Sequence, residues 1–319
     1  MIDSIGRNID YMRISVTDRC NLRCKYCMPI GIKLTEMKNI LTFEEIIQIV
    51  KAAVNLGIKN FRITGGEPLV RNDIENLIKM IRDISGVKSI SMTTNGILLK
   101  EKAIRLKEAG LNNINISLDT LNPNEFYNIT GKDELYKVLE GIFQAKKSGL
   151  DVKINTVLRK ETDWEELISF GEKHGLPVRF IEMMPIGYGK DFDYISNDIL
   201  IKAIRKRFGD YSIDIKNYGN GPARYLQFKN LQIPVGFISA IDHSFCRKCN
   251  RIRLTSEGYL KLCLCFNKGV DLRNLLRSHV KDDELQEIMK SAIFNKPVEH
   301  KFNSYKEITE EKSMVSIGG

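Results

Sequence analysis

Residues 11–27 of this chain read YMRISVTDRCNLRCKYC, a short β-like run followed by three closely spaced cysteines. These are Cys20, Cys24 and Cys27, separated by three and then two residues. Three thiolates this close together suit a soft metal centre, and a cubic four-iron cluster held by them would keep one iron open. A zinc knuckle is the alternative, but it normally needs a fourth Cys or His, and neither occurs elsewhere in residues 1–67.

The composition excludes several classes of protein. Hydrophobic residues make up 43% of the chain and charged residues 28%, as in an ordinary globular protein. No run approaches the roughly 20 apolar residues of a transmembrane helix, and the first ten residues lack the apolar core of a secretory signal. Seven cysteines in two clusters favour metal thiolates in a cytoplasmic protein over disulfides. The net charge of +9 indicates either an anionic partner or a lysine-rich solvated surface.

The first part of the chain alternates β-like runs with amphipathic helical stretches. The expected strands are residues 11–16, 60–64, 89–94, 112–118, 152–158 and 178–183. The expected helices are residues 42–56, 73–84, 98–109, 134–147 and 164–173. Six strand-then-helix units imply a parallel sheet wound right-handedly. The expected fold is therefore α/β, an incomplete (βα)6 TIM-like barrel, because a complete barrel has eight such units.

The pattern changes after Pro185, where a glycine-rich loop precedes a helix at 199–208 and a β-rich stretch at 211–238. We expect a smaller C-terminal α+β cap that carries the second cysteine cluster. The expected division is a partial barrel over residues 1–185 and this cap over residues 186–319.

Strand alternation predicts what lines the barrel, because residues two apart on a strand share a face. The apolar face must meet the helices, so the polar face points inward. The inward-facing cations are Arg13, Arg62, Lys153 and Arg179. Buried cations are costly unless an anion neutralises them, and a triphosphate would do so. The alternatives are an incorrect strand phase or pairing with Glu67, Asp119 and Glu182.

Active sites of βα barrels lie in the loops that follow the strands. The second expected strand runs into Gly65-Gly66-Glu67-Pro68, which would face the cysteine loop across the barrel mouth. Paired glycines let the backbone approach a ligand closely, so this loop is expected to be a ligand cradle; a tight turn is the simpler alternative.

A second cysteine cluster lies near the end of the chain. Its members are Cys246, Cys249, Cys263 and Cys265. His243 with the first three of these cysteines has the composition of a zinc site, and an iron–sulfur cluster fits the spacing equally well. Arg251 and Arg253 project on one side of an extended segment and could bind a phosphate or a carboxylate; isolated surface charge is the alternative.

The motif Cys20-x3-Cys24-x2-Cys27, with Tyr26 before its last cysteine, resembles that of the radical S-adenosylmethionine (SAM) enzymes, as does the Gly-Gly-Glu-Pro segment. More narrowly, the chain resembles the GTP 3′,8-cyclase family of molybdenum cofactor biosynthesis over nearly its whole length. The segments that carry this resemblance are residues 13–20, 62–69, 93–96, 179–182, 245–253 and the terminal Gly-Gly.

The resemblance implies two [4Fe-4S] clusters, with SAM bound to the open iron of the first. One electron would cleave SAM, and the 5′-deoxyadenosyl radical would abstract the 3′ hydrogen of GTP. The C3′ radical would then attack guanine C8, and one further electron and a proton would complete (8S)-3′,8-cyclo-7,8-dihydroguanosine 5′-triphosphate in a lyase reaction.

The resemblance also implies roles for individual residues. Ligands of the first cluster would be Cys20, Cys24 and Cys27, and those of the second Cys246, Cys249 and Cys263. SAM contacts would fall on Tyr26, Gly66, Ser117 and Met184. GTP contacts would fall on Arg13, Arg62, Thr93, Lys153, Arg251, Ile252 and Arg253. Catalysis would also involve Gly318 and Gly319, together with Arg251 and Arg253. The presence of Cys265 leaves open which cysteine supplies the third thiolate of the second cluster.

The implied partners are GTP and, downstream, a cyclic pyranopterin monophosphate synthase, with neither nucleic acid nor a membrane involved. The electron donor and the oligomeric state stay open, with a homodimer as one candidate. Two competing functions are a radical SAM peptide maturase and a zinc-stabilised nucleic-acid-binding protein. Inward-facing cations and the Arg251/Arg253 pair argue against a peptide substrate, and basic residues spread over several strand faces fit nucleic-acid binding poorly.

Overall fold

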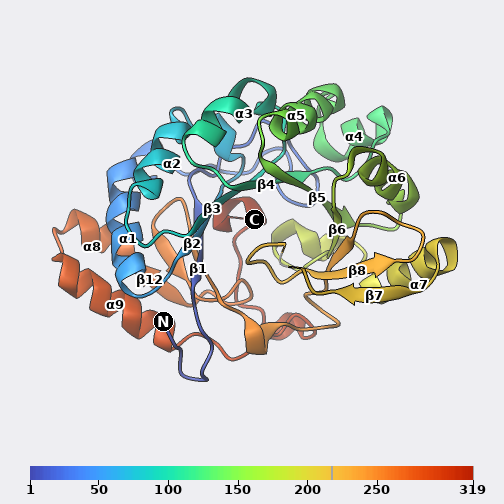
Figure 1. Ribbon diagram of the computed structural model, residues 1–319. Helices are drawn as coiled ribbons and strands as arrows, with labels where there is room; N and C mark the ends of the chain where they lie inside the picture. The colour runs from blue at the N-terminus through green and yellow to red at the C-terminus, as the bar shows by residue number, and fades with distance from the viewer. Residues whose placement is uncertain (217, 319) are drawn as a thin grey trace.

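A single curved sheet forms the centre of the computed structural model, which describes residues 1–216 and 218–318 (Figure 1). Its strand order is β12-β11-β10-β1-β2-β3-β4-β5-β6-β9-β8-β7. The strands from β10 to β9 in this order run parallel, and antiparallel pairings add the remaining strands at the two edges. Helices α1, α2, α3, α5 and α6 cover the outside of the curve (Figure 1).

The first half of the chain supplies six of these strands and six helices. The strands are β1 (Tyr11–Ser15), β2 (Asn60–Thr64), β3 (Ser89–Thr94), β4 (Asn113–Ser117), β5 (Asp151–Leu158) and β6 (Val178–Glu182). The helices are α1 (Phe43–Asn55), α2 (Ile74–Arg82), α3 (Leu99–Glu108), α4 (Pro123–Thr130), α5 (Leu135–Lys147) and α6 (Trp164–His174). All six predicted strands and all five predicted helices are present, and the incomplete barrel is confirmed. Only α4 was not predicted.

The second half supplies the edges of the sheet and the helices beside them. Its strands are β7 (Tyr211–Asp214), β8 (Arg224–Phe228), β9 (Val235–Ile238), β10 (Arg251–Leu254), β11 (Tyr259–Lys261) and β12 (Gly269–Asp271). Its helices are α7 (Asn197–Phe208), α8 (Leu272–Arg277), α9 (Asp282–Phe294) and α10 (Met314–Ile317). Short 3-10 turns occur at Met37–Asn39, Pro68–Val70, Gly187–Asp191, Cys246–Lys248 and Tyr305–Glu307.

The C-terminal half therefore does not form a separate sheet above the barrel. Strand β9 pairs with β6 and strand β10 pairs with β1, both in parallel. The sequence did not predict this extension of the sheet. The boundary between residues 185 and 186 stays a prediction.

Helix α1 illustrates how the local sequence fixes the elements. Thr42 and Glu45 form a reciprocal capping box, in which each side chain accepts a hydrogen bond from the backbone N–H of the other residue. This satisfies two donors that the first turn of a helix leaves without partners. The apolar side of α1 buries Ile46, Ile49 and Val50 completely. Burial of such side chains stabilises the fold by about 1.5–3 kcal/mol each.

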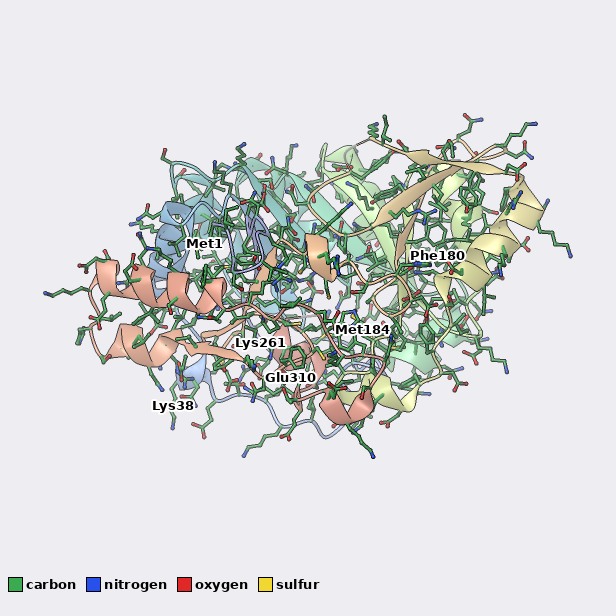
Figure 2. The ribbon with its side chains drawn as sticks, turned by 90° about the horizontal axis from the view of Figure 1, so that it is seen from below. Met1, Lys38, Phe180, Met184, Lys261 and Glu310 are labelled. Carbon is green, nitrogen blue, oxygen red and sulfur yellow. The ribbon has the colours of Figure 1, made fainter. Side chains whose placement is uncertain are left out.

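A buried ion pair ties the C-terminal tail to the sheet. Lys261 on β11 pairs with Glu310, and the two side chains lie side by side (Figure 2). Their side chains are 2% and 1% exposed, and Lys261 also donates to the carbonyl of Phe266. Removing either partner would leave a buried charge without compensation, which is strongly destabilising. This pair anchors the tail just before α10, which lies inside the curve of the sheet (Figure 1).

No helix in the described part of the chain combines the length and the apolar composition needed to span a bilayer.

Candidate active site

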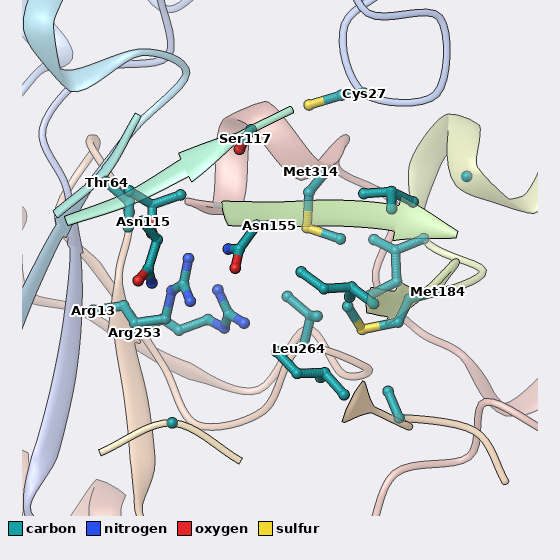
Figure 3. A pocket seen from close by; sticks show the side chains of 18 of the residues that line it. Arg13, Cys27, Thr64, Asn115, Ser117, Asn155, Met184, Arg253, Leu264 and Met314 are labelled. Atoms are coloured by element: carbon teal, nitrogen blue, oxygen red, sulfur yellow. The ribbon is translucent and has the colours of Figure 1, made fainter. Parts of the chain in front are cut away.

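A cavity of about 340 Å³ lies inside the curve of the sheet, and residues from both halves of the chain line it. Figure 3 shows the cavity from close by, with Arg13 and Arg253 side by side and Asn115 and Asn155 next to them. Cys27 lies away from this group, on the far side of Met314 in the same view. The arginines and Cys27 of the first cysteine loop therefore lie at different ends of the cavity.

The first cysteine loop brings Cys20, Cys24 and Cys27 to the cavity wall. A tight turn supports it, since the amides of Cys27 and Met28 both donate to the carbonyl of Cys24, at 3.0 and 2.8 Å. The amide of Leu22 donates to the Sγ of Cys20 at 3.4 Å.

Tyr26 fastens this loop to the end of β4. Its hydroxyl donates to Oδ2 of Asp119 at 2.7 Å, while Oδ1 of Asp119 accepts from the amide of Val157 on β5. One carboxylate thus connects the cysteine loop to two neighbouring strands.

Burial is the main cause of a raised pKa at all three thiols of this loop. Burial, followed by the nearby Glu67 carboxylate, raises the pKa of Cys20 to about 11. Burial, followed by Cys20 and Asp119, raises the pKa of Cys27 to about 12. Such thiols ionise together only when a metal supplies the compensating charge, as happens on coordination.

Within residues 1–216 and 218–318, no three His, Cys, Asp or Glu side chains are arranged to hold one metal ion. The thiolates of a cubic cluster bind different irons, so they lie further apart than the ligands of a single ion.

The Gly-Gly-Glu-Pro loop packs directly against the segment that leads into the cysteines. A Cβ at Gly66 would lie 2.4 Å from the carbonyl oxygen of Arg19, and one at Gly65 would lie 2.7 Å from that of Thr17. Glycine is required there because the two backbones touch. Both glycines also line the cavity, so this tightly packed loop forms part of the cavity wall; its role as a ligand cradle stays a prediction.

Glu67 in this loop orients the next strand end. It is buried and accepts hydrogen bonds from the hydroxyl of Thr94 and the amide of Asn95, both at 2.6 Å. Burial raises the pKa of Glu67 to about 7 despite these hydrogen bonds. The side-chain Nδ2 of Asn95 donates to the side-chain oxygen of Asn21 at 2.7 Å and to the Sγ of Cys20 at 3.9 Å. Glu67 therefore supports the cysteine loop indirectly.

Three arginines stand in a row across neighbouring strands. Arg13 on β1 is in register with Arg253 on β10 and with Arg62 on β2, and all three line the cavity. Burial, followed by Arg253, lowers the pKa of Arg13 well below its usual value, and burial with Arg251 lowers that of Arg253 to about 10. Clustered guanidinium groups out of water call for an anion between them.

Two buried amide oxygens lie beside this row without a partner in the described part of the chain. They are Oδ1 of Asn115 and Oδ1 of Asn155, and both residues line the cavity. A buried polar atom without a hydrogen bond is costly, so the arrangement fits a polar ligand at this end.

The predicted inward-facing cations divide into two groups. Arg13, Arg62 and Arg179 line the cavity, as predicted. Lys153 is not among the lining residues; it is buried at 2% exposure and paired with Asp151. It lies two residues before Asn155 on the same face of β5, so it sits deeper in the barrel.

Most of the remaining residues predicted to contact SAM or GTP also reach the cavity. Its lining includes Tyr26, Gly66, Thr93, Ser117, Met184 and Arg251. Ile252 does not line it, because its side chain is 1% exposed and belongs to the hydrophobic core. Any contact of Ile252 with a ligand would have to come from its backbone.

The second cysteine cluster lines the same cavity through Cys246, Cys249 and Cys263. Cys265 is fully buried, and its Sγ accepts a hydrogen bond from the amide of Lys301 at 3.3 Å. His243 points elsewhere, since its Nε2 contacts Asp198 at 2.9 Å. The zinc set that includes His243 is therefore not assembled.

The pKa of Cys249 is shifted downward, whereas those of Cys20 and Cys27 are shifted upward. Burial raises its pKa, but the cations of Lys296 and Arg251 outweigh burial and bring the pKa down to about 7. A thiolate at this position is therefore stabilised before any metal binds.

The C-terminal tail enters the cavity region. Nη1 of Arg253 donates to the carbonyl of Gly318 at 2.7 Å. Gly318 has a φ of +74°, and a Cβ there would lie 2.9 Å from the Cβ of Ser15. Glycine is therefore the residue that fits between β1 and Arg253. Gly319 lies outside the described residues.

Sequence reasoning assigned no role to Asn115, Asn155 or Lys296. Strand alternation places Asn115 and Asn155 on the inward polar face, but amides carry no distinctive motif. Lys296, which lines the cavity beside the second cysteine cluster, follows helix α9 and has no local signal.

Comparisons with known proteins agree with this geometry. Residues 14–171 match the family model described as the radical SAM superfamily, and residues 176–302 match the one described as Molybdenum Cofactor Synthesis C. The chain is 43% identical over 323 residues to a GTP 3′,8-cyclase of Clostridium perfringens, with 100% of both chains covered. It is 44% identical over 328 residues to that of Alkaliphilus oremlandii, again with 100% of both covered.

Solved structures share the fold at lower identity. Streptococcus suis SuiB bound to S-adenosylmethionine has a TM-score of 0.63 and 17% identity, covering 89% of this chain and 68% of that one. Native anSMEcpe with bound AdoMet has a TM-score of 0.60 and 18% identity, covering 92% and 82%. With both family models and full-length relatives in agreement, the chain belongs to the radical SAM superfamily and, within it, to the GTP 3′,8-cyclase family.

Proposed function

We propose that this protein converts GTP to (8S)-3′,8-cyclo-7,8-dihydroguanosine 5′-triphosphate for molybdenum cofactor biosynthesis. One observation carries the proposal: two cysteine triads and a row of arginines line a single cavity. Two clusters and a triphosphate account for this combination, whereas a peptide substrate would leave the arginines without counter-charges.

In the proposal, Cys20, Cys24 and Cys27 hold the first [4Fe-4S] cluster, and SAM binds beside it. Tyr26, Gly66, Ser117 and Met184 contact the SAM molecule. The chemistry that bound SAM and its cluster would supply is hydrogen-atom abstraction from the 3′ carbon of GTP. The protein's task is to hold that carbon in reach and to keep water away.

The proposed GTP site extends from the arginine row to the second cysteine triad. Arg13, Arg62 and Arg253 bind the triphosphate, since guanidinium groups match phosphate oxygens in charge and geometry. Thr93, which accepts a hydrogen bond from Arg62 at 3.3 Å, adds a hydroxyl. Lys153, which is buried deeper in the barrel than the cavity wall, contributes its positive charge to the triphosphate site.

At the other end of the substrate, Cys246, Cys249 and Cys263 hold the second cluster against the guanine base. Arg251, whose guanidinium lies 4.6 Å from the ring centre of Phe245, and the backbone of Ile252 contact the nucleotide. Gly318 closes the cavity next to Arg253, and we assign a catalytic role to it together with Gly319.

The proposal includes a reducing, cytoplasmic location, where thiolate ligands persist. It also includes delivery of the product to a cyclic pyranopterin monophosphate synthase. A homodimer is part of the same hypothesis.

Anaerobic incubation with SAM, dithionite and GTP tests the proposal. The brown protein is expected to contain about eight irons, four per cubic cluster, and to yield 5′-deoxyadenosine together with a cyclised nucleotide of the same mass as GTP. ATP in place of GTP is expected to give no cyclised product. A colourless protein that contains only zinc would contradict the proposal.

A further inference from the structure

Lys296 is a buried cation in the wall of the cavity, and none of the roles proposed above involves it. It is 4% exposed and lines the cavity together with Cys246, Cys249 and Cys263. Its Nζ donates to the carbonyl of Leu262, the residue before Cys263.

The surroundings of Lys296 contain sulfur but no paired carboxylate in the described part of the chain. Burial lowers the pKa of Lys296 from its usual value and Arg7 and Arg251 lower it further, while Cys249 and Cys263 oppose this shift and favour the charged form. A buried lysine normally has a carboxylate partner. Among the described residues, the neighbouring negative charge comes from the thiolates of Cys249 and Cys263 and from what they bind.

The backbone that carries Lys296 is held rigidly to the second cysteine triad. Arg7 donates to the carbonyl of Lys296 at 3.1 Å and to that of Cys246 at 3.0 Å. It also donates to the carbonyls of Pro297 and Val298, at 2.8 and 3.0 Å, while Asp3 fixes its Nε at 2.6 Å.

The same segment reaches a sulfur directly. The amide of His300 donates to the Sγ of Cys246 at 3.3 Å. Residues 296–300 therefore touch one cysteine of the triad and the backbone beside another, which is the arrangement expected of groups that orient and tune metal ligands.

We propose that Lys296 is a fixed positive charge of the second cysteine site that stabilises the reduced form of the cluster held there. The proposal rests on the function proposed above, because it requires a cluster on Cys246, Cys249 and Cys263. Reduction adds one negative charge to a cluster, so a buried cation beside it raises the reduction potential. The effect is large because little water screens it.

The test uses the full-length chain with Cys20, Cys24 and Cys27 replaced by alanine, so that only the second cluster is assembled. The reduced cluster is followed by electron paramagnetic resonance during an anaerobic redox titration. Adding Lys296→Met is expected to lower the ratio of reduced to oxidised cluster at least tenfold at the parent's midpoint, a shift of 59 mV toward negative potential. Lys296→Arg, which keeps the positive charge, is expected to have a midpoint potential close to that of the parent.

Lys301→Met is the matched control. Lys301 lies five residues further along the same segment, but its side chain is 40% exposed and pairs with Glu299. Its removal is expected to leave the midpoint potential unchanged, because solvent already screens that charge.

Each outcome decides the proposal. A shift in Lys296→Met with rescue in Lys296→Arg supports it, whereas loss of the cluster in the methionine variant would make Lys296 a structural residue and overturn it. Equal potentials in Lys296→Met and its parent, or equal effects of methionine and arginine, would overturn it. If the parent with intact Lys296 binds no iron, the proposed second cluster itself fails, whatever Lys296 does.

Discussion

Replacing Arg253 by alanine is expected to reduce GTP cyclisation by roughly 100-fold, while SAM cleavage to 5′-deoxyadenosine continues. Arg253 stands in register with Arg13 and also donates to the carbonyl of Gly318, so the substitution removes a proposed triphosphate contact and a contact that holds the tail. A hydrogen bond to a charged group contributes about 1.5–3 kcal/mol, and each 1.36 kcal/mol is tenfold in rate. Both products can be measured by chromatography after anaerobic turnover, and Arg251→Ala is expected to behave in the same way.

Arg247→Ala is the matched control for these variants. Arg247 belongs to the same cysteine loop but is exposed and does not line the cavity. Its turnover is expected to equal that of the parent protein. Cyclisation that persists at the parent rate in both Arg251→Ala and Arg253→Ala would remove these residues from the substrate site.

Replacing Cys24 by alanine is expected to lower the iron content from about eight to about four per chain and to abolish 5′-deoxyadenosine formation, because a cubic cluster depends on its thiolates. Iron analysis and chromatography check the two effects separately. A variant that retains eight irons and cleaves SAM would show that Cys24 is not a ligand.

Cys265→Ala is the matched control, since Cys265 is a buried cysteine that does not line the cavity. It is expected to keep both clusters. Loss of four irons from this variant would instead make Cys265 a ligand of the second cluster, in place of Cys263.

Much of the site could be predicted because it follows from strand alternation and from the rule that barrel sites lie at strand ends. Arg13, Arg62 and Arg179 line the cavity since the apolar residues of their strands are committed to the helices. The cysteine loop and Gly65-Gly66 meet because β1 and β2 are neighbours in the sheet.

The rest depends on pairing between segments that are far apart in the sequence. The register of Arg253 with Arg13 exists only because β10 pairs with β1, and no local pattern indicates that pairing. Lys153 has the correct strand phase, but its depth and the nearby Asp151 keep it from the cavity wall. Lys296 reaches the second cysteine triad because Arg7, from the other end of the chain, holds its backbone there.

The most direct test of the account follows the fate of one hydrogen atom. GTP carrying deuterium at its 3′ carbon is incubated anaerobically with the protein, SAM and dithionite, and the 5′-deoxyadenosine is analysed by mass spectrometry. If the cavity holds the 3′ carbon of GTP against SAM, the 5′-deoxyadenosine gains one deuterium and the cyclised nucleotide loses it. Unlabelled 5′-deoxyadenosine, with the deuterium retained in the nucleotide, would contradict the account.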